Sequence, residues 1–124
     1  MTPELRGVVV AHGDLARALV ASVEEISGIR GVLTAVSNSG CDRASLEQRI
    51  AQAVEGRPSL VFVDLPSGSC LFAAMRRLAG FPEVRVVTGV NLAMLLDFVF
   101  HRELDVVAAA GRAAEAGAKA ILQR

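Results

Sequence analysis

Aromatic residues are scarce in this chain, which has no Trp, no Tyr and only 5 Phe among 124 residues. We therefore expect a core of aliphatic side chains, with few rings available to stack on nucleobases. The 13 basic and 13 acidic residues cancel, so the basic excess of a typical nucleic-acid-binding protein is also missing. Both absences argue against a nucleic-acid partner.

The chain also has few cysteines and lacks the glycine-rich motifs of nucleotide-binding loops. The two cysteines, Cys41 and Cys70, form no CxxC pair, which predicts neither a disulfide framework nor a metal site. There is no GxGxxG and no GxxxxGK[ST], so no dinucleotide or nucleotide cofactor is expected. The longest apolar stretch, 90–100, is interrupted by Asn91 and Asp97, and the first residues are too polar for a signal peptide. A cytoplasmic protein is the expectation.

Strand-like and helix-like segments alternate along the chain. Short β-branched runs predict buried strands at 7–11, 31–36, 60–63 and 84–87. The segments between and after them predict helices at 14–26, 42–55, 69–79, 91–100 and 104–116. This alternation predicts an α/β fold in a single domain over 1–124, a three-layer α/β/α sandwich with a four-stranded parallel central sheet. Residues 118–122 are assigned to a short C-terminal edge strand, although a helix fits Ala and Lys equally well.

Two side chains with catalytic chemistry follow predicted strands. In an open parallel sheet, ligands bind at the carboxyl ends of the strands. His12 follows the first strand and Asp64 follows the third. A carboxylate that holds one imidazole nitrogen leaves the other nitrogen free as a nucleophile. By position alone, His12 could equally be a loop histidine without a function. For Asp64, position alone favours a structural role in a turn or as a helix cap over a catalytic one. His101 is expected to be an exposed residue at a helix end.

The segment Ser67-Gly68-Ser69 precedes a predicted helix. Free N–H groups at a helix start, together with a hydroxyl group, suit a phosphoryl group, and the same structure would form if Ser69 were only an N-cap. Gly13 leaves room beside His12 for another molecule. A Ser-His-Asp hydrolase built from Ser69, His12 and Asp64 is disfavoured, because Ser69 is not in a GxSxG elbow.

Taken together, these segments resemble the IIA domain of the mannose-type (mannose/fructose/sorbose) sugar phosphotransferase system. The resemblance extends to about Ile121, with matching stretches in family order at 7–13, 63–69, 73–74 and 89–95. It implies that His12 carries a phosphoryl group on Nε2, that Asp64 orients the ring through Nδ1, and that Ser69 steadies the phosphoryl oxygens. It places the remaining phosphate-binding positions at Gly13, Ser67, Gly68 and Cys70.

The resemblance also implies partners. Phosphate would arrive from the phosphocarrier protein HPr and leave to a IIB component for sugar uptake, with membrane contact only through a IIC/IID complex. The chain would be a phosphotransferase and a homodimer, in which the strand at 118–122 adds to the partner's sheet. The chain departs from a common family pattern at three positions: Ser67 stands for Gly, Cys70 for Pro and Phe72 for Asn. Without that Pro, the first turn of the helix is less pre-formed.

Two other functions remain compatible with the same histidine. An orphan IIA-like module would control a partner protein through its phosphorylation state. The phosphocarrier of a dihydroxyacetone kinase also has a histidine after its first strand, but typically has Met-Gly-Ser after its third. The segments 64–69 and 89–91 resemble the mannose family more closely.

Overall fold

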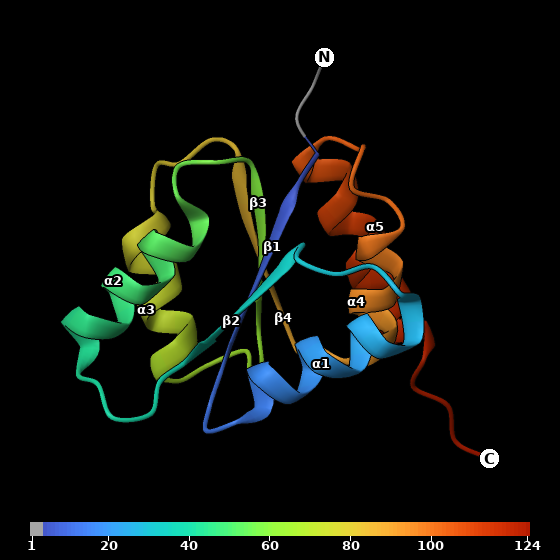
Figure 1. Ribbon diagram of the computed structural model, residues 1–124, viewed down its shortest axis with the longest axis horizontal. Helices are drawn as coiled ribbons and strands as arrows, with labels where there is room; N and C mark the ends of the chain where they lie inside the picture. The colour runs from blue at the N-terminus through green and yellow to red at the C-terminus, as the bar shows by residue number, and fades with distance from the viewer. Residues whose placement is uncertain (1–3) are drawn as a thin grey trace.

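Four parallel strands form the central layer of the computed structural model, which describes residues 4–124 (Figure 1). The signal-peptide prediction falls in part on residues 1–3, outside the described range. Strands and helices alternate within 4–124 in the following order: β1 (Arg6–Ala11), α1 (Leu15–Ser27), β2 (Leu33–Ser37), α2 (Arg43–Val54), β3 (Ser59–Val63), α3 (Ser69–Leu78), β4 (Val84–Thr88), α4 (Leu92–Val99) and α5 (Val106–Lys119).

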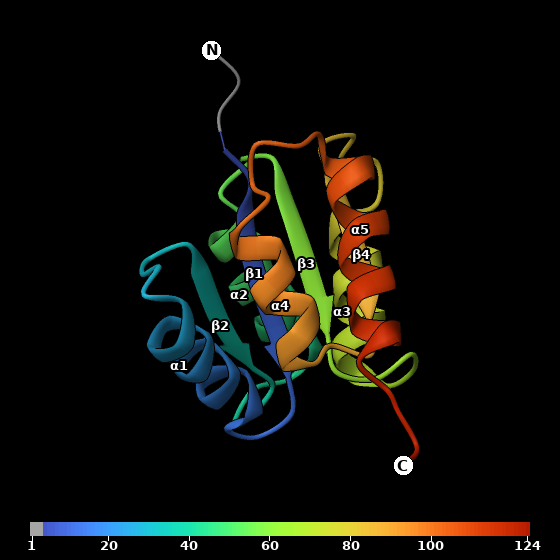
Figure 2. The same cartoon turned by 90° about the vertical axis from the view of Figure 1, so that its right-hand side faces the viewer.

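The strand order in the sheet is β2-β1-β3-β4, and every neighbouring pair is parallel. Helices α2 and α3 cover one face of the sheet, and α1, α4 and α5 cover the other (Figures 1 and 2). The predicted three-layer α/β fold with a four-stranded parallel sheet is therefore confirmed. Because β1 pairs directly with β3, the residues that follow these two strands lie side by side at the lower edge in Figure 1.

The core is aliphatic, as the composition predicts. Successive strand residues point to opposite faces, so Val8 and Val10 pack against α2 and α3, while Val9 packs against the other three helices. Gly7 is required for this packing. A Cβ atom there would lie 2.7 Å from the ring of Phe98 and still closer to Leu33.

Helix ends agree with the sequence at two sites and differ at a third. Asp42 accepts a hydrogen bond from the backbone N–H of Ser45 at 2.8 Å, and Gly28 ends α1 in the left-handed conformation. Ser69 is not the N-cap of α3. Gly68 takes that position, with a φ of 95° that favours glycine, and Ser69 is the first helical residue.

The predicted C-terminal edge strand is contradicted by the structure. Helix α5 continues through Gly117 to Lys119, and residues 120–124 belong to no strand. Gly117 is a packing residue: its Cβ would lie 2.7 Å from Met94 Cε of α4, and its carbonyl accepts a hydrogen bond from Asn91 Nδ2 at 3.1 Å. Contact with α4 thus explains this glycine, which the sequence alone presents as a helix breaker.

His101 follows α4 and is half-buried rather than exposed; its Nδ1 lies 2.7 Å from the carbonyl oxygen of Asp97, within hydrogen-bond distance. Among residues 4–124, each helix is too short or too polar to span a bilayer.

Candidate functional site

His12 and Asp64 meet at the carboxyl edge of the sheet. His12 directly follows β1 and Asp64 directly follows β3, and the register pairs Val10 with Val63. The backbone N–H of Asp64 donates to the carbonyl of Val10 at 3.3 Å, which continues the ladder into the loop. Two residues 52 positions apart in the sequence are thereby placed in direct contact.

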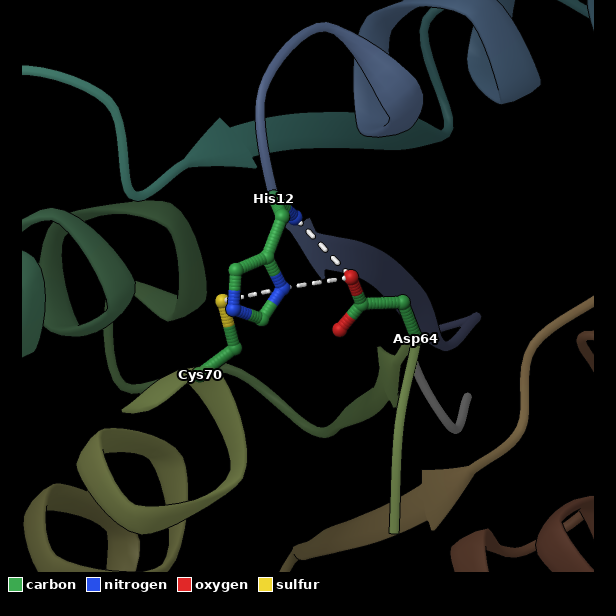
Figure 3. Close-up of side chains that lie close together, drawn as sticks. All are labelled: His12, Asp64 and Cys70. Carbon is green, nitrogen blue, oxygen red and sulfur yellow. Dashed lines mark hydrogen bonds and ion pairs between the residues drawn. The ribbon is translucent and has the colours of Figure 1, made fainter. Parts of the chain in front are cut away.

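Asp64 holds His12 through two hydrogen bonds to one oxygen. Its Oδ2 lies 2.7 Å from the ring Nδ1 and accepts the His12 backbone N–H at 2.9 Å (Figure 3). Its Oδ1 accepts the backbone N–H of Leu65 at 3.0 Å. Burial alone would raise the pKa of Asp64, but the hydrogen bonds from His12 and Leu65 outweigh it and hold the pKa below its usual value. An ionised Asp64 favours the tautomer with a proton on Nδ1, which leaves the lone pair on Nε2.

The two side chains differ in exposure in the way a nucleophile and its orienting acid require. The side chain of His12 is 43% exposed, whereas that of Asp64 is 8% exposed. The ring can therefore be reached by another molecule, while the carboxylate remains shielded behind it. The roles that the family resemblance implies for the two residues, nucleophile and orienting acid, stay predictions.

The loop after β2 supports the turn that follows His12. Gly13 adopts a left-handed φ of 59°, its N–H donates to Asn38 Oδ1 at 3.2 Å, and its carbonyl accepts a hydrogen bond from Ser37 Oγ at 2.7 Å. Arg49 of α2 in turn donates to the carbonyls of Ser37 and Ser39 at 2.9 and 3.2 Å. The sequence indicates polar residues here but not this role, because it does not specify that β2 lies beside β1.

The start of α3 contributes backbone donors that have no hydrogen-bond acceptor within residues 4–124. The first helical hydrogen bond runs from Phe72 N–H to the Gly68 carbonyl at 3.0 Å, so the N–H groups of residues 69–71 precede the helical ladder. Ser67, Gly68 and Ser69 are exposed. Among the described residues, no hydrogen bond joins the hydroxyl of Ser67 or Ser69 to His12 or Asp64.

Cys70 is the one predicted phosphate-site residue with a buried side chain. Its Sγ lies 3.8 Å from His12 Nδ1, against the ring on the side away from Asp64 (Figure 3). Burial, with a further contribution from the Asp64 charge, raises the pKa of the Cys70 thiol to about 11. The thiol is therefore neutral near pH 7. Cys41, the other cysteine, is half-buried and donates to the carbonyl of Asn38 at 3.2 Å.

The structure thus brings His12, Asp64 and Cys70 together. A ring nitrogen, a carboxylate oxygen and the sulfur of these residues all lie within 4.8 Å of one another, a set of atoms that could hold a metal ion. No such site was expected, because no CxxC motif is present. The signal is visible only in three dimensions, since His12 follows β1, Asp64 follows β3 and Cys70 lies in α3.

Comparison with known proteins agrees with this geometry. Residues 7–115 match the family model described as the PTS system fructose IIA component (EIIA-man), and the chain belongs to this family of phosphotransferase-system IIA components. No curated protein matches.

Solved structures share the fold at low sequence identity. One is phosphotransferase system component EIIA from Streptococcus agalactiae, with a TM-score of 0.88, 20% identity and 96% of each chain covered. Another is the mannose/sorbose specific IIA subunit from Enterococcus faecalis, with a TM-score of 0.86, 23% identity, and 98% of this chain and 96% of that chain covered. A sigma-54 interaction domain protein from Enterococcus faecalis also matches, with a TM-score of 0.80, 11% identity, and coverage of 97% and 95%.

Proposed function

We propose that this chain is a cytoplasmic phosphoryl carrier of the sugar phosphotransferase system, in which His12 accepts phosphate from phospho-HPr and passes it to a IIB component. The observation that carries the proposal is the 2.7 Å contact of Nδ1 with Asp64 Oδ2 beside a ring that another protein can reach. Family membership supports it, because the matched model describes a phosphotransferase IIA component.

The transfer needs positioning more than covalent machinery. The Nε2 lone pair attacks phosphorus in line with the nitrogen of the donor phosphohistidine; the new N–P bond forms as the old one breaks, and the donor ring retains its electron pair. Asp64 stabilises the positive charge that develops on the His12 ring, and the Nδ1 proton stays between them. The same steps run in reverse toward the acceptor.

The start of α3 would steady the phosphoryl oxygens. We assign this role to the backbone N–H groups of Gly68, Ser69 and Cys70 and to the hydroxyls of Ser69 and Ser67, because unpaired donors at a helix N-terminus stabilise anions. Gly13 leaves the approach to the ring open, since its lack of a side chain keeps the space beside His12 free.

An exposed apolar surface beside the site suits a protein partner. Leu65, Phe72 and Met75 are each at least half exposed, and Arg43 stacks over the Phe72 ring at 4.5 Å. Solvent-exposed aromatic and Met side chains with an Arg neighbour are typical of protein interfaces. We assign this surface to HPr and the IIB component, which would dock in turn. Self-association as a homodimer remains part of the proposal.

The test is phosphorylation with phosphoenolpyruvate, enzyme I and HPr. Acid-labile label on the wild-type chain is expected, and ³¹P NMR should assign it to Nε2. His12→Ala should remain unlabelled. His101→Gln is the matched control, because it replaces the only other histidine and should be labelled like the wild type. An unlabelled wild type would refute the carrier role, and label on His12→Ala would refute the site.

A regulatory role is the second candidate, favoured by the structural match to the sigma-54 interaction domain protein. Both functions use the same phosphohistidine, so the acceptor separates them. Offering phospho-His12 chain to a IIB component should discharge it if the chain serves transport. If IIB does not accept the phosphoryl group, transfer to a dihydroxyacetone kinase would support the role of a phosphocarrier for that kinase. Binding of a regulator only to the phosphorylated chain would support the regulatory role.

A further inference from the structure

The Cys70 side chain contacts the His12 ring from the side that Asp64 does not occupy. Its Sγ lies 3.8 Å from Nδ1 and packs against the ring, while Asp64 Oδ2 lies 2.7 Å from the same nitrogen (Figure 3). The ring is therefore bounded by a carboxylate on one side and by a sulfur atom on the other. The proposed transfer uses the backbone N–H of Cys70 but gives no function to its thiol.

A single hydrogen bond does not fix the direction of an imidazole ring. Asp64 holds Nδ1, but χ2 of histidine has no sharply preferred value, so Nε2 on the far side of the ring can still swing. In-line attack on phosphorus requires one direction of Nε2, and a misplacement of about 1 Å can slow an enzymatic reaction about a hundredfold. A second contact with the ring is needed to fix Nε2.

Cys70 is itself held firmly enough to supply this contact. It is the second residue of α3, and its side chain is completely buried in the cluster that α2 and α3 form with one face of the sheet. Val10 and Val63 belong to the same cluster and lie in β1 and β3, the strands that lead to His12 and Asp64. The sulfur is thus fixed against the same framework that places the ring and the carboxylate.

We propose that Cys70 is a positioning residue, whose sulfur blocks rotation of the His12 ring toward α3 and thereby directs Nε2 toward a docked partner. Sulfur suits this role because it is polarizable and makes favourable contacts with aromatic rings. The thiol exchanges no proton and no electron in this role. The effect on transfer rests on the proposed carrier function, whereas the restriction of the ring does not.

The restriction of the ring is tested by NMR on the unphosphorylated, reduced, full-length chain. ¹³C relaxation at Cε1 and Cδ2 of His12 should report a lower order parameter in Cys70→Ala than in the wild type, because the γ atom is missing. Cys70→Ser keeps a γ atom and should keep the ring ordered. The ring of His101, which lies beside the Asp97 carbonyl, is the internal control and should not change. An equally ordered His12 ring in Cys70→Ala would overturn the proposal.

The effect on transfer is tested by measuring labelling over a range of phospho-HPr concentrations. The maximal rate of Cys70→Ala should fall about 2- to 12-fold, the loss of one sulfur–aromatic contact. The half-saturating concentration should stay unchanged, because the buried sulfur does not reach the docking surface. Cys70→Ser should transfer at close to the wild-type rate. Ala74→Gly is the matched control, because it loosens the buried face of α3 one turn further along the helix.

Each outcome of the labelling experiment decides one point. An equal fall in Ala74→Gly would assign the effect to stability and overturn the positioning role. An equal fall in Cys70→Ser and Cys70→Ala would overturn it too, as would a change confined to the half-saturating concentration. A wild type that accepts no label, with a His12 ring that loosens in Cys70→Ala, would instead remove the carrier function and leave the restriction of the ring standing.

Discussion

Replacing Asp64 with Asn keeps the shape of the side chain but removes an acceptor that the site needs. In the wild type, Oδ2 accepts two hydrogen bonds from His12 and Oδ1 accepts one from Leu65. An amide offers one oxygen and one NH₂ group. If its oxygen faces His12, the NH₂ group opposes the N–H of Leu65. If its NH₂ group faces His12, Nδ1 must accept, and the proton moves to Nε2.

Either orientation weakens transfer by a calculable amount. A hydrogen bond to a charged group contributes about 1.5–3 kcal/mol, and each 1.36 kcal/mol changes a rate tenfold. We therefore expect Asp64→Asn to accept phosphate about 10- to 150-fold more slowly than the wild type. Rapid-quench measurement of labelling from phospho-HPr gives this rate. Asp14→Asn is the control, because Asp14 is an exposed acid near the same loop that pairs with Arg17 and does not touch His12.

The same variant tests the electrostatics independently of catalysis. The pKa of Asp64 is lowered in the folded chain from an ordinary value near 3.8, so its contribution to stability is complete above that value and is lost as pH falls through the folded pKa. The free energy of unfolding should thus fall more steeply in the wild type than in Asp64→Asn as pH decreases below about 4. Labelling of Asp64→Asn within twofold of wild type, together with parallel acid unfolding curves, would refute the role given to Asp64.

Two further predictions concern packing and loop support. Gly7→Ala should lower the free energy of unfolding by about 1–3 kcal/mol in urea titrations, because the added methyl group meets Leu33 and Phe98. Gly111→Ala is the control: its methyl group enters open space on α5 and should raise the free energy of unfolding by about 0.5–1 kcal/mol. Equal effects of the two substitutions would contradict the packing argument. Asn38→Ala should slow labelling of His12 by about 2- to 12-fold, the loss of one neutral hydrogen bond to Gly13, with unchanged acid-lability of the label; an unaltered rate would show that Asn38 does not position the turn.

The placement of His12 and Asp64 could be predicted from the sequence, because both follow short β-branched apolar runs that favour buried strands. Parallel strands end at the same edge, so a residue after each of two strands is expected there. The contact itself depends on β1 lying next to β3, which the sequence pattern leaves open. The support from Ser37 and Asn38 depends in the same way on β2 being the other neighbour of β1.

Cys70 and Gly117 show why the rest could not be predicted. The direction of the Cys70 side chain depends on the path of loop 64–68, where Gly68 rather than Ser69 caps α3 and turns the second helical residue inward. Gly117 favours a helix end by local propensity, yet close approach of α4 to α5 overrides that preference. In both cases the local structure depends on contacts between residues far apart in the sequence. The spacing of residues along the chain does not reveal such contacts.

The separation of His12 and Asp64 by 52 residues has a consequence for biosynthesis. A ribosome-bound fragment that ends before β3 contains His12 but lacks Asp64, and a chain with β1 detached from β3 lacks their contact. Under the proposed carrier function, such half-made or damaged copies would accept phosphate more slowly than native molecules. The phosphorylated pool would then be enriched in native molecules without any separate quality-control step.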